Sequence, residues 1–177
     1  PEMGGGKPVF GAISPNARVP ALELSDVVIA ESLAICEWAA EQNPALWPKG
    51  TSDRALARSA ASIMHSGFPN LRNDAPMNIR RRTDAGRMTP AGLDDAAKVD
   101  ELWSGWLKRS GGPFLFGEYS VADAMYAPVI TRFVTYAIPR SAEAQGYIDR
   151  MVAEPHMAAW IAAAEKETRT LPRSDIA

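Results

Sequence analysis

The sequence of 177 residues predicts a mostly helical protein, in which an all-helical bundle follows a short α/β segment made of a β-hairpin and one helix. Two short β-prone runs near the start predict the hairpin, and apolar residues at helical spacing after residue 52 predict the bundle. A stretch rich in proline separates the two parts. At about 150 residues per domain, this length corresponds to one domain and part of a second. We therefore expect a partial α/β domain over 1–43, a linker over 44–52 and a helical domain over 53–177.

The hairpin is predicted from the β-prone runs VPALEL over 19–24 and VVI over 27–29. The polar pair Ser25-Asp26 between them suits a tight turn. From Glu31 onward the apolar residues take helical spacing, and Asn43-Pro44 ends this helix because proline has no N–H to donate.

The helical part begins at about Asp53 with a helix whose apolar stripe includes Met64 and Phe68, and Pro69 predicts a kink near its end. A loop is expected from 73 to 88. Later helix starts are marked by a capping residue or by a proline in the first turn. They fall at Thr89-Pro90, Ser120, Ser141 and Pro155. Ser120 and Asp123 form a capping box, and the apolar residues after them predict a buried helix.

The composition disfavours several classes of partner and site. A net charge of -2 gives no positive field for nucleic acid or an anionic membrane surface, and no apolar run reaches the roughly 18 residues of a membrane span. One cysteine and two histidines provide neither a disulfide nor a set of zinc ligands, which predicts no metal site and favours a reducing cytosol.

The Gly-rich stretch over 1–8 carries neither a phosphate-binding loop nor a signal peptide. Pro8 follows Gly-Gly-Gly-Lys where a phosphate-binding loop needs serine or threonine, and a secretory succession of basic, apolar and small residues is missing. We expect this end to be introduced, processed or truncated.

Glu31 and Ser32 stand where a strand gives way to a helix. The first turn of a helix offers N–H groups and a partial positive charge, which with the Ser32 hydroxyl suit a carboxylate, while Glu31 suits an ammonium group. Together they could bind the charged end of an amino acid. The simpler alternative is that Ser32 only caps the helix and Glu31 stabilises its first turn. The residues alone leave both interpretations open.

Two separate motifs, in the correct order, resemble the cytosolic glutathione S-transferases. SPNARVPAL over 14–22, the hairpin and ESLAICEWAAE over 31–41 are similar to the second half of their thioredoxin-like domain. FLFGEYSVADAMYAPVITRF over 114–133 is similar to the signature of their helical domain. MHSGFPNLR and PMNIRRR resemble segments of bacterial members. The resemblance extends from about residue 8 to about residue 167 and implies a partial thioredoxin-like domain followed by the helical bundle of this family.

The resemblance implies a glutathione site. It implies that Pro20 follows a cis peptide bond and that the backbone of Val19 pairs with the cysteinyl part of glutathione. Glu31 and Ser32 match the pair that holds the γ-glutamyl end, in agreement with the argument from the helix start. Arg18 lies where the family often has a polar or basic residue near the peptide.

The resemblance also places a substrate pocket along the helix that contains Met64, to which we assign His65 and Phe68. A solvated polar face is the alternative for His65. Arg72 and the arginines of the following loop form a basic cluster that suits either an anionic substrate or a solvated loop. Arg132 lies on an otherwise apolar helix face and needs a carboxylate or carbonyl partner if it is buried.

The family's thiol-activating Tyr, Ser or Cys lies before the region that this chain matches, so we name no catalytic residue. The resemblance implies a cytoplasmic homodimer that uses glutathione as co-substrate, without a metal, and transfers its sulfur to a small electrophile. Two alternatives stay open: a glutathione-dependent isomerase, and a non-catalytic binding or scaffolding module of the same fold.

Overall fold

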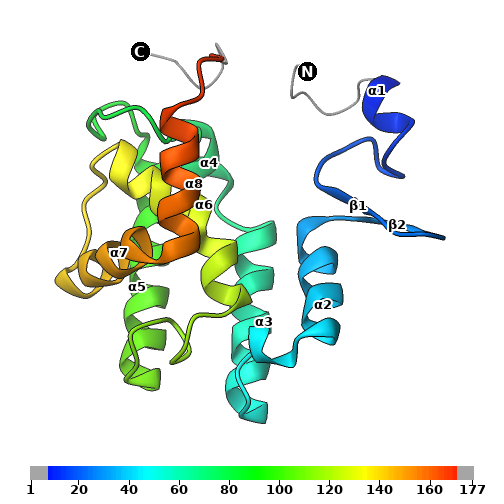
Figure 1. Ribbon diagram of the computed structural model, residues 1–177. Helices are drawn as coiled ribbons and strands as arrows, with labels where there is room; N and C mark the ends of the chain where they lie inside the picture. Colours follow the sequence, from blue (N-terminus) through cyan, green and yellow to red (C-terminus); the bar gives the residue numbers. More distant parts are fainter. Residues whose placement is uncertain (1–7, 171–177) are drawn as a thin grey trace.

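The computed structural model describes residues 8–170, which fold into a small lobe and a larger helical lobe (Figure 1). The small lobe contains a short helix and a hairpin followed by a longer helix: α1 (Pro8–Gly11), β1 (Ala21–Glu23), β2 (Val28–Ala30) and α2 (Ser32–Gln42). After the 3-10 turn η1 (Pro44–Leu46), the larger lobe contains α3 (Thr51–Ser66), α4 (Pro69–Asp74), α5 (Pro90–Ser110), α6 (Val121–Thr135), α7 (Ala142–Ala153) and α8 (Pro155–Glu165). The predicted fold class, a helical bundle after a partial α/β domain, is confirmed.

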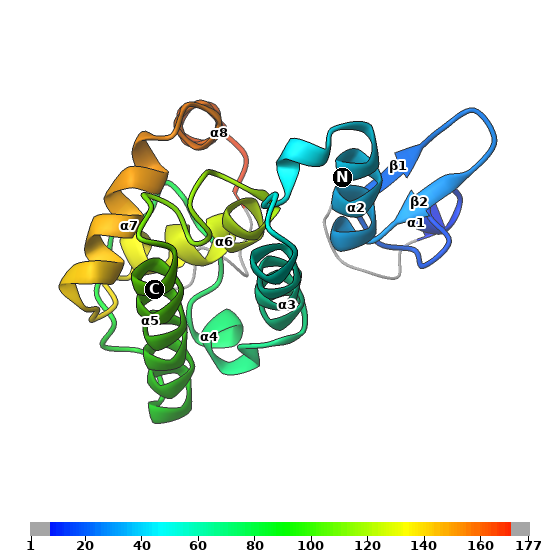
Figure 2. The same ribbon diagram turned by 90° about the horizontal axis from the view of Figure 1, so that it is seen from below.

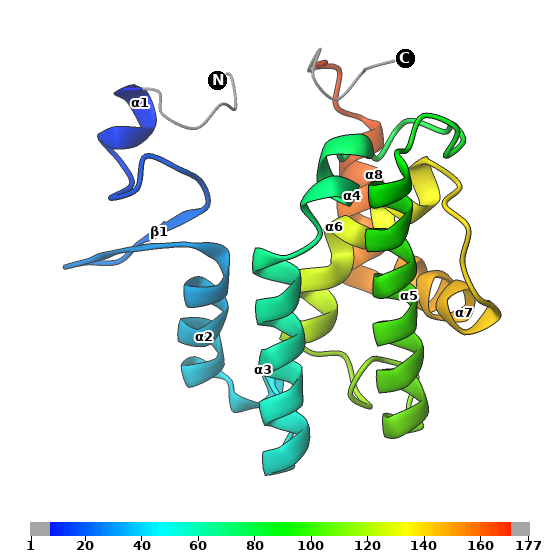
Figure 3. The same ribbon diagram turned by 180° about the vertical axis from the view of Figure 1, so that it is seen from behind.

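The two strands pair antiparallel, with Leu22 opposite Ile29, as the sequence predicts. The amide of Leu24 donates to the carbonyl of Val27 at 2.9 Å and closes the turn over Ser25 and Asp26. Two strands alone are only marginally stable, and helix α2 packs on both of them. In Figure 2, α2 lies between the hairpin and α3, and in Figure 3 it lies below the hairpin and beside α3, so this helix joins the small lobe to the bundle.

Helix α6 is the centre of the bundle, and the prediction that it is buried is confirmed. An aromatic cluster forms around the fully buried Trp103 of α5, whose ring centroid lies 5.2–5.6 Å from those of Tyr126, Phe133 and Tyr147. Such tilted and edge-to-face pairs add to the stabilisation that comes from burial.

The predicted helix starts at Pro90, Val121, Ala142 and Pro155 are all present. The carboxylate of Asp123 is fully buried in the capping box and accepts from the backbone N–H of Ser120 at 3.0 Å. It also accepts from the backbone N–H of Leu115 and from the Tyr147 hydroxyl, at 3.0 and 2.9 Å. This carboxylate therefore ties the preceding loop and α7 to the start of α6.

The kink predicted at Pro69 is instead a complete break between two helices. Helix α3 ends at Ser66, Phe68 has a left-handed φ of 60°, and α4 begins at Pro69. The carboxylate of Asp95 on α5 accepts from the backbone N–H groups of Asn70 and Leu71, at 2.9 and 3.0 Å. The break is stabilised from a neighbouring helix, which local periodicity does not indicate.

The division into 1–43, 44–52 and 53–177 stays a prediction, and its outermost residues, 1–7 and 171–177, lie outside the described part. Within the predicted linker the chain forms η1, and α3 begins at Thr51, two residues earlier than expected.

Candidate functional site

A cleft of about 410 Å³ lies between the small lobe and the bundle. Its small-lobe side combines the loop before β1 with the start of α2: Asn16, Arg18, Val19, Pro20, Glu31 and Ser32. Its bundle side comes from α3, α4 and α6: Met64, His65, Arg72, Pro128, Val129 and Arg132. The fold therefore brings together all five residues that the resemblance assigned to glutathione, and His65 faces the same cleft.

The peptide bond between Val19 and Pro20 is cis, as the resemblance implies. Both residues line the cleft immediately before β1. Arg18 precedes them, and its backbone N–H donates to the side chain of Asn16 at 3.1 Å.

The start of α2 differs from the simple capping interpretation. Ser32 is the first helical residue rather than the cap, and the preceding Glu31 has φ 80° and ψ 129° and makes no capping hydrogen bond with its side chain. A left-handed φ on a residue other than glycine costs about 1–3 kcal/mol and often marks functional sites. In the described part of the chain, no side chain accepts from the first turn of α2. These N–H groups remain donors beside the Ser32 hydroxyl.

The Glu31 carboxylate is held from both lobes. It accepts from Asn16 Nδ2 at 3.0 Å, and its other oxygen lies 3.5 Å from His65 Nε2. Asn16 also accepts from the Ser14 hydroxyl at 2.8 Å, so one amide side chain organises the loop from 14 to 18. Asn16 was not predicted as a site residue. The signal available in the sequence is the tendency of asparagine to bond its own backbone two residues on.

Two arginines form part of the bundle side of the cleft. Arg72 donates through Nε to the carbonyl of Gly67 at 3.0 Å and through Nη2 to the carbonyls of Met64 and His65. Arg132 donates through Nε to Ala75 at 2.9 Å and through Nη1 to Pro128 at 2.8 Å. The predicted need of Arg132 for a carbonyl partner is confirmed. Burial, together with the nearby charge of Arg72, lowers the pKa of Arg132 to about 10.

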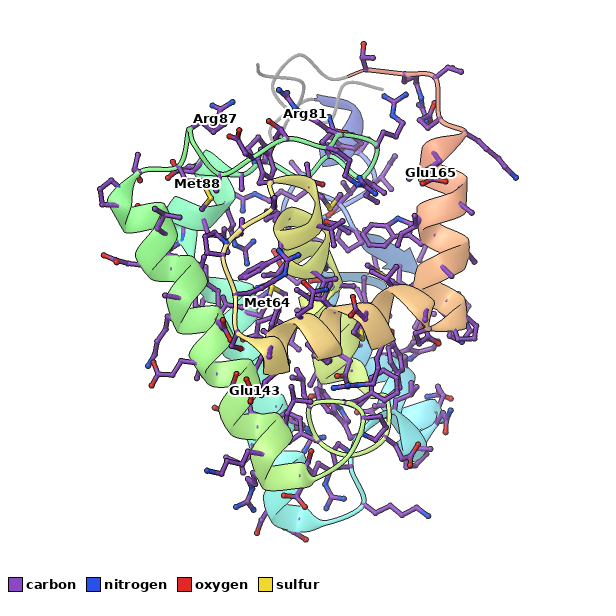
Figure 4. All side chains as sticks on the ribbon, turned by 90° about the vertical axis from the view of Figure 1, so that its left-hand side faces the viewer. Met64, Arg81, Arg87, Met88, Glu143 and Glu165 are labelled. Atoms are coloured by element: carbon purple, nitrogen blue, oxygen red, sulfur yellow. The ribbon has the colours of Figure 1, made fainter. Side chains whose placement is uncertain are left out.

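Phe68, predicted in the substrate pocket, lies elsewhere. Its side chain is only 8% exposed and packs in the hydrophobic core rather than lining the cleft. The basic loop is also separate, because Arg81 and Arg87 lie at one end of the bundle, away from Met64, as Figure 4 shows. Of the arginines grouped from the sequence, only Arg72 lines the cleft.

The described residues give little support for a metal site, a reactive cysteine or a membrane-spanning helix. Among residues 8–170, no three His, Cys, Asp or Glu side chains gather in a group able to hold a metal ion. Burial, and to a lesser extent the charge of Glu37, raises the pKa of the Cys36 thiol, which disfavours the reactive thiolate. None of the helices described here has the length and apolar character of a membrane span.

Family models match both parts of the chain. The N-terminal domain of glutathione S-transferase matches residues 2–42, and the C-terminal domain matches residues 89–163. Glutathione S-transferase 1 of Dianthus caryophyllus is 32% identical, over 72% of this chain and 60% of its own length. A probable maleylacetoacetate isomerase of Caenorhabditis elegans is 37% identical, over 67% of this chain and 56% of its own length.

The fold also matches solved structures. A theta class glutathione S-transferase from Xanthomonas axonopodis pv. citri, solved with glutathione bound, has a TM-score of 0.66 and 24% identity. That match covers 91% of this chain and 80% of the other. This chain therefore spans less than two thirds of the curated relatives and most of the structural neighbour. The models of the N-terminal and C-terminal domains match successive parts of the chain, in the order that the fold requires. The protein therefore belongs to the glutathione S-transferase family.

Proposed function

We propose that the cleft binds glutathione and that the protein uses its sulfur in transfer to a small electrophile. The observation that carries the proposal is the start of α2, where Glu31 and Ser32 both line the cleft and the Glu31 side chain does not cap the helix. The γ-glutamyl end of glutathione carries one carboxylate and one ammonium group. The helix start suits the carboxylate, and Glu31 suits the ammonium.

The neighbouring residues extend the proposed site along the peptide. The backbone of Val19, beside Pro20, would pair with the cysteinyl part of glutathione, and Arg18 would lie near the peptide. His65 lies on the opposite side of the cleft and supports Glu31 through their contact at 3.5 Å.

The chemistry requires glutathione thiolate, because a thiol with a pKa of about 8.5 is mostly protonated at neutral pH. The thiolate would then attack the electrophile bound on the bundle side of the cleft. We assign no catalytic residue, since the resemblance puts no residue of this chain at the thiol-activating position. The identity to a probable maleylacetoacetate isomerase favours glutathione-dependent isomerisation as the second candidate. Both reactions need the same glutathione site.

Membership of the family also supports a cytoplasmic homodimer. Light scattering after size-exclusion chromatography is expected to give twice the chain mass of 19.1 kDa. A monomer at all concentrations would remove this part of the proposal.

Calorimetric titration with glutathione tests the site directly. Ser32→Ala and Glu31→Gln are each expected to weaken binding about tenfold, since each removes a hydrogen bond to a charged group. Glu41→Gln is the matched control, because Glu41 lies on the same helix outside the cleft. Unchanged affinity in both site variants would show that the site is assigned wrongly. Binding of glutathione without turnover of 1-chloro-2,4-dinitrobenzene would favour the non-catalytic alternative.

A further inference from the structure

The bundle side of the cleft has a positive charge that the described residues do not balance. Arg72 and Arg132 both line it, and they are close enough for the charge of Arg72 to disfavour that of Arg132. Among residues 8–170, neither guanidinium makes an ion pair with a carboxylate. Arg132 is half-buried and Arg72 is exposed. A half-buried charge with a like charge close by is unfavourable unless an anion is nearby.

The guanidinium groups are fixed in place, although they are not neutralised. Both bond to backbone carbonyls at or beside helix ends, Arg72 to Gly67 and Arg132 to Ala75. In the described part of the chain these bonds use Nε and one terminal nitrogen of each arginine, leaving Nη1 of Arg72 and Nη2 of Arg132 as donors. A fixed planar guanidinium with donors to spare is the usual partner of a carboxylate or phosphate.

On the small-lobe side of the cleft, the charged groups of glutathione would pair with groups of opposite charge on the protein. Under the proposed function, Glu31 takes the ammonium group and the start of α2 takes the adjacent carboxylate, while Arg18 lies near the rest of the peptide. Arg72 and Arg132 lie across the cleft, on α4 and α6, where the electrophile would bind. We propose that these two arginines bind a carboxylate of the second substrate, so that the protein selects electrophiles that carry an acidic group. This inference rests on the proposed function.

A matched pair of glutathione conjugates tests this selection without requiring turnover. S-(4-carboxybenzyl)glutathione and S-benzylglutathione differ only in one carboxylate, which the cleft would hold on its bundle side. Calorimetric titration at pH 7 is expected to give about tenfold tighter binding of the carboxylated conjugate, the effect of one charge-assisted contact. The ratio of the two affinities should fall as salt is added, because Arg72 is exposed and dissolved ions screen its charge.

Variants then assign the effect to the two arginines. Arg72→Gln is expected to reduce the ratio of the two affinities below twofold, because it weakens binding of the carboxylated conjugate more than binding of S-benzylglutathione. Arg132→Gln should do the same. Thermal unfolding checks the fold of both variants, because Arg72 bonds three backbone carbonyls and Arg132 bonds two. Arg109→Gln, which removes a surface arginine paired with Asp53, should keep the full advantage. If Arg132→Gln does not fold, Arg72→Gln decides alone.

Three results would overturn the inference, and they are distinguishable. Equal affinity of the wild type for both conjugates would show that no carboxylate is selected. Equal weakening of both conjugates by Arg72→Gln would show that the arginine binds a carboxylate of glutathione itself. Failure of both conjugates and of glutathione to bind would remove the proposed function together with the inference.

Discussion

Replacing Asp123 by asparagine tests how strongly one buried carboxylate holds the centre of the bundle. The carboxylate is fully buried and accepts from two backbone N–H groups, of Leu115 and Ser120, and from the Tyr147 hydroxyl. Asparagine keeps the shape but replaces one acceptor oxygen by an NH₂ group that faces donors. A hydrogen bond to a charged group contributes about 1.5–3 kcal/mol, so we expect the free energy of unfolding to fall by about 2–4 kcal/mol.

Urea unfolding at pH 7, followed by far-UV circular dichroism, measures this loss. Asp149→Asn is the matched control, because Asp149 is exposed on α7 and accepts one hydrogen bond from Gln145. Its expected change stays within about 0.5 kcal/mol. A loss of that size or smaller for Asp123→Asn would refute the reasoning.

The same variant has a defined dependence on pH. Burial raises the pKa of Asp123, and its hydrogen bonds oppose this rise only in part. Between the aspartate pKa of the unfolded chain, about 4, and the raised pKa of the folded protein, the folded state binds more protons. The stability from this group therefore falls as the pH rises through that window. The difference in unfolding free energy between wild type and Asp123→Asn should narrow from pH 4 upward, and a widening difference would contradict the direction of the shift.

Two further substitutions test contacts elsewhere in the fold. Gly92→Ala would place a Cβ 2.2 Å from Asp74 Oδ2, an atom that also accepts from Thr89, so we expect a loss of about 1–3 kcal/mol in unfolding free energy. An unchanged melting temperature would show that α4 and α5 separate easily. Arg58→Ala removes the pair with Glu37 between α3 and α2, at 3.0 Å. Because both side chains are well exposed, the expected cost is at most about 1 kcal/mol, and a larger loss in urea unfolding would show that the lobes depend on this pair.

The features of the fold that could be predicted from the sequence depend on residues that lie close together in the sequence. The hairpin turn at Ser25-Asp26 and the caps at Thr89, Ser120 and Ser141 follow from residues within a few positions of one another. The break before Pro69 could not be predicted in this way, because it depends on the carboxylate of Asp95, some 25 residues away.

The candidate site also contains residues that the sequence places together and residues that only the fold brings together. Val19, Pro20, Glu31 and Ser32 belong to one local motif, so the resemblance places them together, and the cleft agrees. Arg72 and Arg132 approach each other only because α4 and α6 both border the cleft, and their spacing in the sequence carries no sign of this. The prediction for Phe68 assumes that the helix with Met64 continues, but α3 ends before Phe68, which packs in the core beside the break.

Glu31 connects the two sides of the proposed site. Its backbone turns the chain from β2 into α2 with a left-handed φ, and its carboxylate contacts Asn16 of its own lobe and His65 of the bundle. An ammonium group bound to this carboxylate would share it with His65, so ligand binding and the contact between the lobes use the same two oxygens. Arg72 follows the break between α3 and α4 and bonds the carbonyl of His65, so His65 lies between Glu31 and the arginine pair on the bundle side of the cleft.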